Sequence, residues 1–344
     1  MMMEFFAGAI SAGGFVSLWP RMTGEQDRQL LVVKGGPGCG KATCIRALSD
    51  AWGGAQEYIR CCSDPDSLDG AVLSDRILAD GTPPHVLEPD FPGCDGEYLA
   101  LPPLLDRAGL AQKREALCAL KAASKAHYAG AYRQLAAALA VRQERRQAVQ
   151  ALLPDGGPEK RAAALITREI PRQPGPGRER LRFLEGVTPK GYVCLYGTVR
   201  DNFPRVIALQ DSYGLAQPLL EKLRQGALLR GQLVYACMDP LEPDRLRHLL
   251  LPDCGVAFVT AEGRLPSAPS RTLRLDAMVP AKALRPLRGR LRLLKKLESS
   301  LVEDACAQVA AAHALHDRME ELYRPHVDFG ALEQFCRQEA DRLK

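Results

Sequence analysis

The chain has 344 residues, of which 46% are hydrophobic and 25% are charged. This length is typical of about two domains, and the apolar fraction is sufficient for a core in each of them. The net charge of +5 is too small to indicate nucleic acid or an anionic membrane as a partner by itself. Eleven cysteines without C-x-x-C spacing predict free thiols in a cytoplasmic protein, and they exclude a zinc framework.

The first apolar stretch, residues 5–19, does not fit a signal peptide. Glu4 stands where a basic segment belongs, and glycines interrupt the stretch. No apolar run is long enough for a transmembrane helix. We therefore expect a cytoplasmic location and no membrane association.

The strongest motif is GGPGCGKAT at residues 35–43, which matches the phosphate-binding loop G-x-x-x-x-G-K. An apolar run at residues 30–33 precedes it and a helical pattern at residues 41–52 follows, so the order is strand, loop and helix. In such a loop the backbone N–H groups and the helix N-terminus bind phosphate, and Lys41 reaches the β- and γ-phosphates. The predicted nucleotide-binding residues are Gly35, Gly36, Pro37, Gly38, Cys39, Gly40, Lys41, Ala42 and Thr43.

Ala42 departs from this motif, because a Ser or Thr hydroxyl normally ligates Mg²⁺ at its position. Thr43 stands one residue late. Mg²⁺ keeps several waters in most sites, so a further water could replace the hydroxyl. Two interpretations stay open: a site that turns over nucleotide with a weakened magnesium shell, and a site that binds nucleotide with little turnover.

Two carboxylates are candidates for the metal side of the site. Asp80 ends a short apolar run and is the first choice, with a simple turn at residues 80–83 as the alternative. Asp64 follows another predicted strand and is the second choice, with a turn or cap as its alternative. His85 and Glu88 lie just beyond Asp80, and either is a weaker candidate for orienting a water molecule.

The sequence also contains an internal repeat. The segment FFAGAISAGGFVSLW, from Phe5, recurs as RFLEGVTPKGYVCLY, from Arg182, and the similarity continues in the same order as far as the helices at residues 136–141 and 310–315. The period is far longer than that of a solenoid repeat, so it predicts a duplicated domain. We expect domains at residues 1–153 and 181–344, with a Pro- and Gly-rich extended linker at residues 154–180. Asp80 is expected to have an apolar counterpart near Phe258 or Val259.

Each half ends in a long helical pattern, at residues 110–153 and 287–323. These arms are expected to pack on each other rather than on an outside partner. The charges of the first arm are predicted to be exposed: Arg142, Glu144, Arg145 and Arg146. The second arm opens with a basic run interleaved with leucines, which favours the solvated face of an amphipathic helix over nucleic-acid binding. A metal site at His313, His316 and Glu320 is a weaker hypothesis, because no fourth ligand is near.

The second half has lost the motif. The equivalent of GGPGCGKAT reads DSYGLAQPL at residues 211–219, with Gln217 in place of the lysine and Pro218 after it. Asp211 would add a negative charge where phosphates bind, which opposes binding. The second repeat is therefore predicted to be a structural or regulatory partner of the first.

The combination of KGGPGCGK, CSDPDSLDG, DGTPPH and the duplicated N-terminal segment resembles a family of bacterial tandem-repeat P-loop ATPases of unestablished role. The resemblance covers most of the chain. It implies an α/β fold with two tandem P-loop NTPase-like three-layer domains, long helical arms, and ATP as the ligand. The chain departs from that family at Ala42 and in its degenerate second copy.

Three functions follow from these observations. The first is a weak Mg²⁺-dependent ATPase or a small-molecule kinase, in which Lys41 stabilises the transferring phosphoryl group and Asp80 or Asp64 holds the metal. The second is a nucleotide-sensing protein, whose arms report ATP binding to a protein partner. The third, a nucleic-acid-linked ATPase, is the weakest. A GTPase is disfavoured, because Asn202 is the single asparagine and is followed by Phe203 rather than by the lysine of N-K-x-D.

Overall fold

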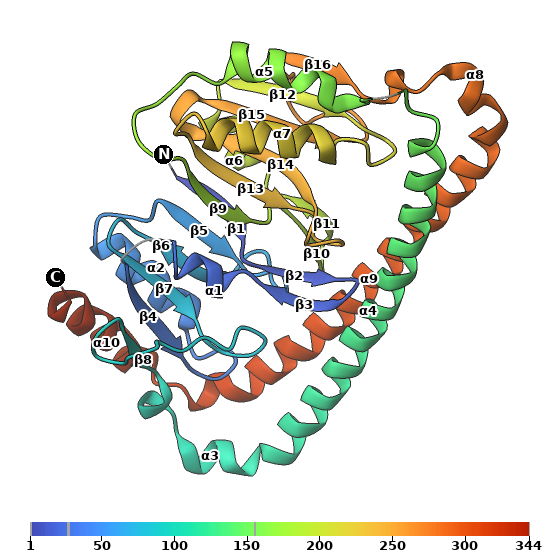
Figure 1. Cartoon of the computed structure of the whole chain (residues 1–344). Helices are drawn as coiled ribbons and strands as arrows, with labels where there is room; N and C mark the ends of the chain where they lie inside the picture. The colour runs from blue at the N-terminus through green and yellow to red at the C-terminus, as the bar shows by residue number, and fades with distance from the viewer. Residues whose placement is uncertain (1, 26–27, 155, 344) are drawn as a thin grey trace.

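The structure is a computed structural model that describes residues 2–25, 28–154 and 156–343. Within these residues the strands form two six-stranded sheets and two separate two-stranded hairpins. Helices accompany both sheets, so the chain has the mixed α/β architecture with two lobes that its sequence predicts (Figure 1). Among the described helices, none is both long and apolar enough to cross a membrane.

The two halves contain matching elements in the same order. The first half consists of β1 (Met3–Phe6), β2 (Gly8–Ser11), β3 (Gly14–Ser17), α1 (Trp19–Met22), β4 (Gln29–Lys34), α2 (Lys41–Ala51), β5 (Glu57–Arg60), β6 (Leu68–Val72), β7 (Arg76–Asp80), β8 (Gly96–Ala100), η1 (Pro102–Leu104), α3 (Arg107–Gln112) and α4 (Arg114–Gln150). A short helical segment follows, with η2 (Pro158–Arg161) and α5 (Ala162–Glu169). The second half consists of β9 (Arg178–Arg182), β10 (Glu185–Thr188), β11 (Gly191–Cys194), α6 (Gly197–Asn202), β12 (Arg205–Gln210), α7 (Gln217–Leu228), β13 (Leu233–Met238), β14 (Leu246–Leu251), η3 (Pro252–Cys254), β15 (Val256–Ala261), β16 (Arg271–Arg274), η4 (Asp276–Met278), α8 (Ala281–Leu284), η5 (Arg285–Leu287), α9 (Arg288–Tyr323), η6 (Arg324–His326) and α10 (Phe329–Arg342).

The two sheets have the same strand order. The first follows β1-β5-β6-β7-β4-β8, and the second follows β9-β13-β14-β15-β12-β16 when it is taken from the corresponding edge. In each sheet the third strand, β6 or β14, runs antiparallel to both of its neighbours. The other pairings in both sheets are parallel. The repeat in the sequence is therefore a repeat of the complete sheet topology.

The hairpins β2-β3 and β10-β11 have the same hydrogen bond in their turns. Ser11 Oγ donates to the carbonyl oxygen of Gly14 at 2.7 Å, and Thr188 Oγ1 donates to that of Gly191 at 2.8 Å. Both glycines have positive φ, 109° and 101°, which a residue with a side chain rarely adopts. The paired positions in the sequence thus have the same local structure.

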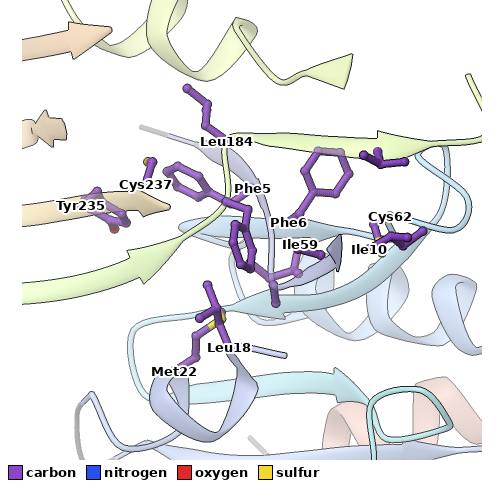
Figure 2. Close-up of a cluster of buried hydrophobic side chains, with 14 of the residues drawn as sticks. Phe5, Phe6, Ile10, Leu18, Met22, Ile59, Cys62, Leu184, Tyr235 and Cys237 are labelled. Atoms are coloured by element: carbon purple, nitrogen blue, oxygen red, sulfur yellow. The ribbon is translucent and has the colours of Figure 1, made fainter. Parts of the chain in front are cut away.

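The two sheets meet at their edge strands β1 and β9. Phe6 and Phe183, which the repeat pairs with each other, form an antiparallel bridge with backbone hydrogen bonds of 2.8 and 3.0 Å. The ring of Phe5 stacks on Tyr235 of the second half at 5.3 Å between centroids. Figure 2 shows Phe5 and Phe6 lying among second-half residues that include Leu184 and Tyr235. A hydrophobic core is therefore shared between the repeats.

The alternation along β4 explains how the first sheet is covered on both faces. Leu30 and Val32 belong to the shared core, whereas Leu31 and Val33 belong to a separate apolar cluster with residues of α2 and α10. Successive side chains of a strand point to opposite faces, so a continuous apolar run is the pattern of a strand buried on both sides. The apolar run at residues 30–33 is such a strand.

The predicted arms are single long helices, α4 with 37 residues and α9 with 36. At 1.5 Å per residue each is about 55 Å long. They lie side by side along one flank of the molecule (Figure 1). The arms pack on each other as predicted, and their contact includes buried residues of the shared core, among them Ala131, Ala138, Ala305 and Val309.

Each arm carries its terminal helix to the opposite repeat. Helix α5, which follows the first arm, packs on α7 of the second repeat, and α10, which follows the second arm, packs on α2 of the first (Figure 1). Trp52 Nε1 of the first repeat donates to the carbonyl oxygen of Ala340 in α10 at 3.0 Å. The arms therefore exchange their ends between the two lobes.

The prediction of an extended linker at residues 154–180 is wrong in its centre. This segment contains η2, α5 and the start of β9. The sequence AAALITRE of α5 has neither Gly nor Pro, and Ala162 and Leu165 are buried in the cluster that includes α7. The helix-breaking residues flank α5 instead of filling the segment.

Candidate functional site

The loop of residues 35–40 joins the carboxyl end of β4 to α2, which begins at Lys41. Gly38 and Gly40 have φ of 63° and 87°, the left-handed region in which glycine is favoured. Gly40 is the N-cap residue of α2, so the positive end of the helix dipole faces the loop. The local structure is the strand, loop and helix that the motif requires.

Lys41 and Asp80 lie together at this loop. β7 is the parallel neighbour of β4, and Val33 is paired with Asp80, so the two strands end side by side. Lys41 Nζ is 3.6 Å from Asp80 Oδ2 and donates to the carbonyl oxygen of Gly36 at 2.9 Å. Asp80, the first candidate for the metal side of the site, thus lies next to Lys41.

Asp80 also makes the turn that was its alternative role. Its Oδ1 accepts from the backbone N–H of Thr82 at 2.9 Å and from the Thr82 hydroxyl at 2.6 Å. Burial raises the pKa of Asp80, and the charge of Lys41 and the bonds from Thr82 counter this only in part. Burial therefore makes the charged form of this carboxylate costly at its position beside Lys41.

Asp64 lies elsewhere. It follows β5, which is separated from β4 by β6 and β7, so about 14 Å of sheet lies between the two strands. Its Oδ1 accepts from the backbone N–H of Asp66 at 3.3 Å, an Asx turn. The structure thus supports the turn role of Asp64 and does not bring it to the loop.

His85 and Glu88 are both engaged in contacts away from Lys41. His85 is 5% exposed, with Nδ1 3.0 Å from Ser17 Oγ and Nε2 3.2 Å from Asp69 Oδ2. Glu88 pairs with Lys34 at 2.8 Å. His85 is thus a buried histidine with two polar partners, and Glu88 belongs to an ion pair with Lys34.

Ala42 is half-buried and packs against the apolar cluster between α2 and α10. It offers no oxygen to a cation. Thr43 is exposed. In the parts of the chain that the structure describes, no three His, Cys, Asp or Glu side chains gather as a metal site, and His313 and His316 instead pair with Asp317 and Glu320 on their own helix.

The loop is covered by the arm of the second repeat, which the sequence did not indicate. A Cβ atom placed on Gly36 would lie 2.4 Å from the ring of Tyr323, and one on Gly40 would lie 2.3 Å from Leu332. One on Gly38 would lie 3.0 Å from Cβ of Glu320. The glycines at positions 36, 38 and 40 indicate that another segment comes close to the loop, but they do not indicate which segment it is.

In the second repeat the equivalent loop is filled by its own side chain. Asp211 corresponds to Gly35, and its carboxylate accepts from the backbone N–H groups of Tyr213, Leu215 and Ala216 at 3.1, 2.8 and 2.7 Å. Asp211 is 2% exposed. The N–H groups that would bind a phosphate already have an anion as their acceptor.

The strand register corrects the counterpart of Asp80. Val33 pairs with Asp80 in the first sheet, and the equivalent Leu209 pairs with Thr260 in the second. The counterpart is therefore Thr260, not Phe258 or Val259. The second repeat thus has Thr260 and Gln217 where the first has Asp80 and Lys41.

The prediction of exposed charges on the first arm is wrong for the arginines. Arg145 is 4% exposed and pairs with Glu298 at 2.7 Å, and Arg142 pairs with Glu298 and with Asp239 at 2.8 and 3.0 Å. Arg146 pairs with Glu242 at 2.8 Å. These side chains are directed at the second repeat because the arm crosses it before it ends.

No protein-family model matches the chain, and no curated protein or solved structure matches it significantly. The function is therefore argued from the geometry of the loop and its surroundings.

Proposed function

We propose that the chain binds ATP at residues 35–43 and that the second repeat is a partner without a nucleotide site. The observation that carries the proposal is the position of Lys41 at the N-terminus of α2, directly after the glycine loop and 3.6 Å from Asp80. Loop N–H groups, a helix N-terminus and a lysine together provide the donors that a polyphosphate needs.

Slow Mg²⁺-dependent hydrolysis at this site is part of the proposal. Asp80 would hold the metal through water, and Lys41 would stabilise negative charge on the transferring phosphoryl group. Ala42 supplies no ligand, so water would complete that part of the magnesium shell. The expected activity is that of a weak ATPase.

A nucleotide-sensing protein with little turnover is the second candidate. Two observations favour it: Ala42 lacks the hydroxyl, and the loop lies under the arm of the other repeat. ATP bound there would act on the position of the arm, which a protein partner could recognise.

Calorimetric titration with ATP, with and without Mg²⁺, tests the binding proposal. The wild-type chain and Lys190→Ala should bind alike, because Lys190 is an exposed lysine paired with Asp66 at the surface. Lys41→Ala should lose binding. Equal affinity of the Lys41→Ala variant and the wild type would show that the loop is not the site.

Phosphate release measured on the same proteins separates the two candidates. The ATPase candidate requires Mg²⁺-dependent hydrolysis above the level of Lys41→Ala. Binding without such hydrolysis would leave the sensing function and exclude the enzyme.

A further inference from the structure

The residue that lies on the centre of the loop is an acid. A Cβ on Gly38 would lie 3.0 Å from Cβ and 3.2 Å from Cα of Glu320, so the helix itself presses on the loop there. His316 lies 3.4 Å from the Glu320 carboxylate and is the main cause of its lowered pKa; the N–H of Gly38 and the charge of Lys41 also lower that pKa. An acidic side chain thus lies against the loop that would bind phosphate.

In the second repeat a basic side chain, that of Arg146, lies against the equivalent loop. The alignment that pairs Gly35 with Asp211 also pairs Gly38 with Gly214, and a Cβ on Gly214 would lie 3.3 Å from the side chain of Arg146. The alignment of the arms pairs Arg146 with Glu320. Where the loop carries its own carboxylate, the arm contributes a cation, and where the loop has none, the arm contributes a carboxylate.

We propose that Glu320 is an intramolecular substitute for phosphate and that residues 320–342 form a cover that nucleotide must displace. The inference rests on the proposed ATP site and adds that this site is composite, with the second repeat supplying an acid that competes with the ligand. Nucleotide binding to the first repeat is thereby coupled to the arm of the second.

The cover is docked on the first repeat by contacts beyond Glu320. The backbone N–H of Asp328 donates to the carbonyl oxygen of Leu104 at 3.0 Å, and Leu332 and Cys336 belong to the apolar cluster of α2 and β4. Displacing the cover exposes these apolar side chains to water, which opposes opening. The affinity for nucleotide is therefore set by the competition between ligand binding and docking of the cover.

Titration with MgATP of three proteins tests the role of the acid. Glu320→Gln keeps the size of the side chain and removes its charge, so its ATP affinity should rise about tenfold, which is within the usual range of coupling between sites. Glu321→Gln, an exposed neighbour on the same helix, should bind like the wild type. Equal affinity of all three proteins would overturn the competition while leaving the ATP site intact. Binding by none of them would overturn the ATP site and the proposal with it.

Hydrogen exchange of the wild-type chain with and without MgATP tests the cover directly. The expected result is slower exchange in residues 35–41 and faster exchange in residues 329–342, because the loop gains a ligand as α10 leaves it. Slower exchange in both segments would show that ATP binds beneath a closed cover, and the proposed displacement would then be wrong.

Discussion

Arg182 of the second repeat and Glu57 of the first form an ion pair with no exposed side-chain surface, Nε lying 2.7 Å from Oε2. Glu57 also accepts from Arg180 and from the Tyr235 hydroxyl, both at 2.8 Å. The carboxylate of Glu57 thus receives its hydrogen bonds from side chains of the other lobe. This arrangement fixes the edge where the two sheets meet.

Glu57→Gln should destabilise the fold strongly, because it removes a fully buried carboxylate that pairs with both Arg180 and Arg182, and Glu25 must then balance both arginines. The expected loss is about 3–5 kcal/mol in the free energy of unfolding, measured by denaturant titration. Asp66→Asn is a matched control: it removes the exposed pair with Lys190, which also joins the two repeats, and should change nothing measurable.

The ion pair of Glu57 and Arg182 predicts that the stability of the fold depends on pH. Burial alone would raise the pKa of Glu57, but Arg182 and its other partners outweigh burial and the pKa lies below its ordinary value. The stabilisation is therefore present above the ordinary glutamate pKa of about 4.3 and is lost as the pH falls through the lowered value. The melting temperatures of wild type and Glu57→Gln should converge in acid, and a constant difference down to the lowest pH would contradict this account.

Asp80→Asn should stabilise the protein above about pH 4. The pKa of Asp80 is raised by burial, so the folded chain holds the proton more tightly than the unfolded chain does, and stability falls as the pH rises through the two values. Thermal melts between pH 3 and 7 measure the effect. Asp75→Asn, just before the same strand, should not stabilise, because its hydrogen bond from Arg76 lowers the pKa of Asp75. A loss of stability in Asp80→Asn at neutral pH would contradict the raised pKa of Asp80.

Asp211→Ala should cost about 3 kcal/mol, because three N–H groups of the second loop lose their acceptor and two of these hydrogen bonds are buried. Chemical denaturation measures the change. Asp64→Ala, which removes one long hydrogen bond from a turn, should stay within about 0.5 kcal/mol of wild type. If both variants unfold alike, the second loop does not need its internal anion.

Ala42→Ser should raise Mg²⁺-dependent ATP hydrolysis, because it restores an oxygen at the position where the motif carries a metal ligand. An increase of about tenfold is expected, the lower end of what one supporting group contributes at a metal site. Ala47→Ser, which adds a hydroxyl at an exposed position of the same helix, serves as the control and should hydrolyse ATP like the wild type. Unchanged hydrolysis by an Ala42→Ser variant that still binds MgATP would mean that another step limits turnover.

The sequence predicted the parts of the fold that depend on local chemistry. The repeated segments that begin at Phe5 and Arg182 were recognised from the sequence, and both contain a hairpin with the same turn hydrogen bond. The loop before Lys41 was predicted from its motif. The placement of Asp80 beside that lysine depends on strand order, which a single sequence indicates only weakly.

The path of the arms could not be predicted in this way. The helical pattern of α9 shows which of its faces is apolar, but it does not state which lobe receives the end of the helix. Glu320 was considered only as a partner of His313 and His316 on one helix, whereas its contact with Gly38 depends on the crossing of two arms. The buried arginines of α4 were misjudged for the same reason.

The exchange of arm ends has a consequence for dissecting the protein. A single repeat with such an arm would need a second copy of itself to receive its last helix, as in a swapped homodimer, and this chain contains both copies in one polypeptide. In a homodimer the two loops must have the same sequence, but in a single chain they can differ. Here one loop has Lys41 and the other has Asp211. Neither half can be removed without uncovering the other: a fragment ending at residue 169 would leave the loop of residues 35–40 without its lid, and a fragment beginning at residue 170 would leave α7 without α5.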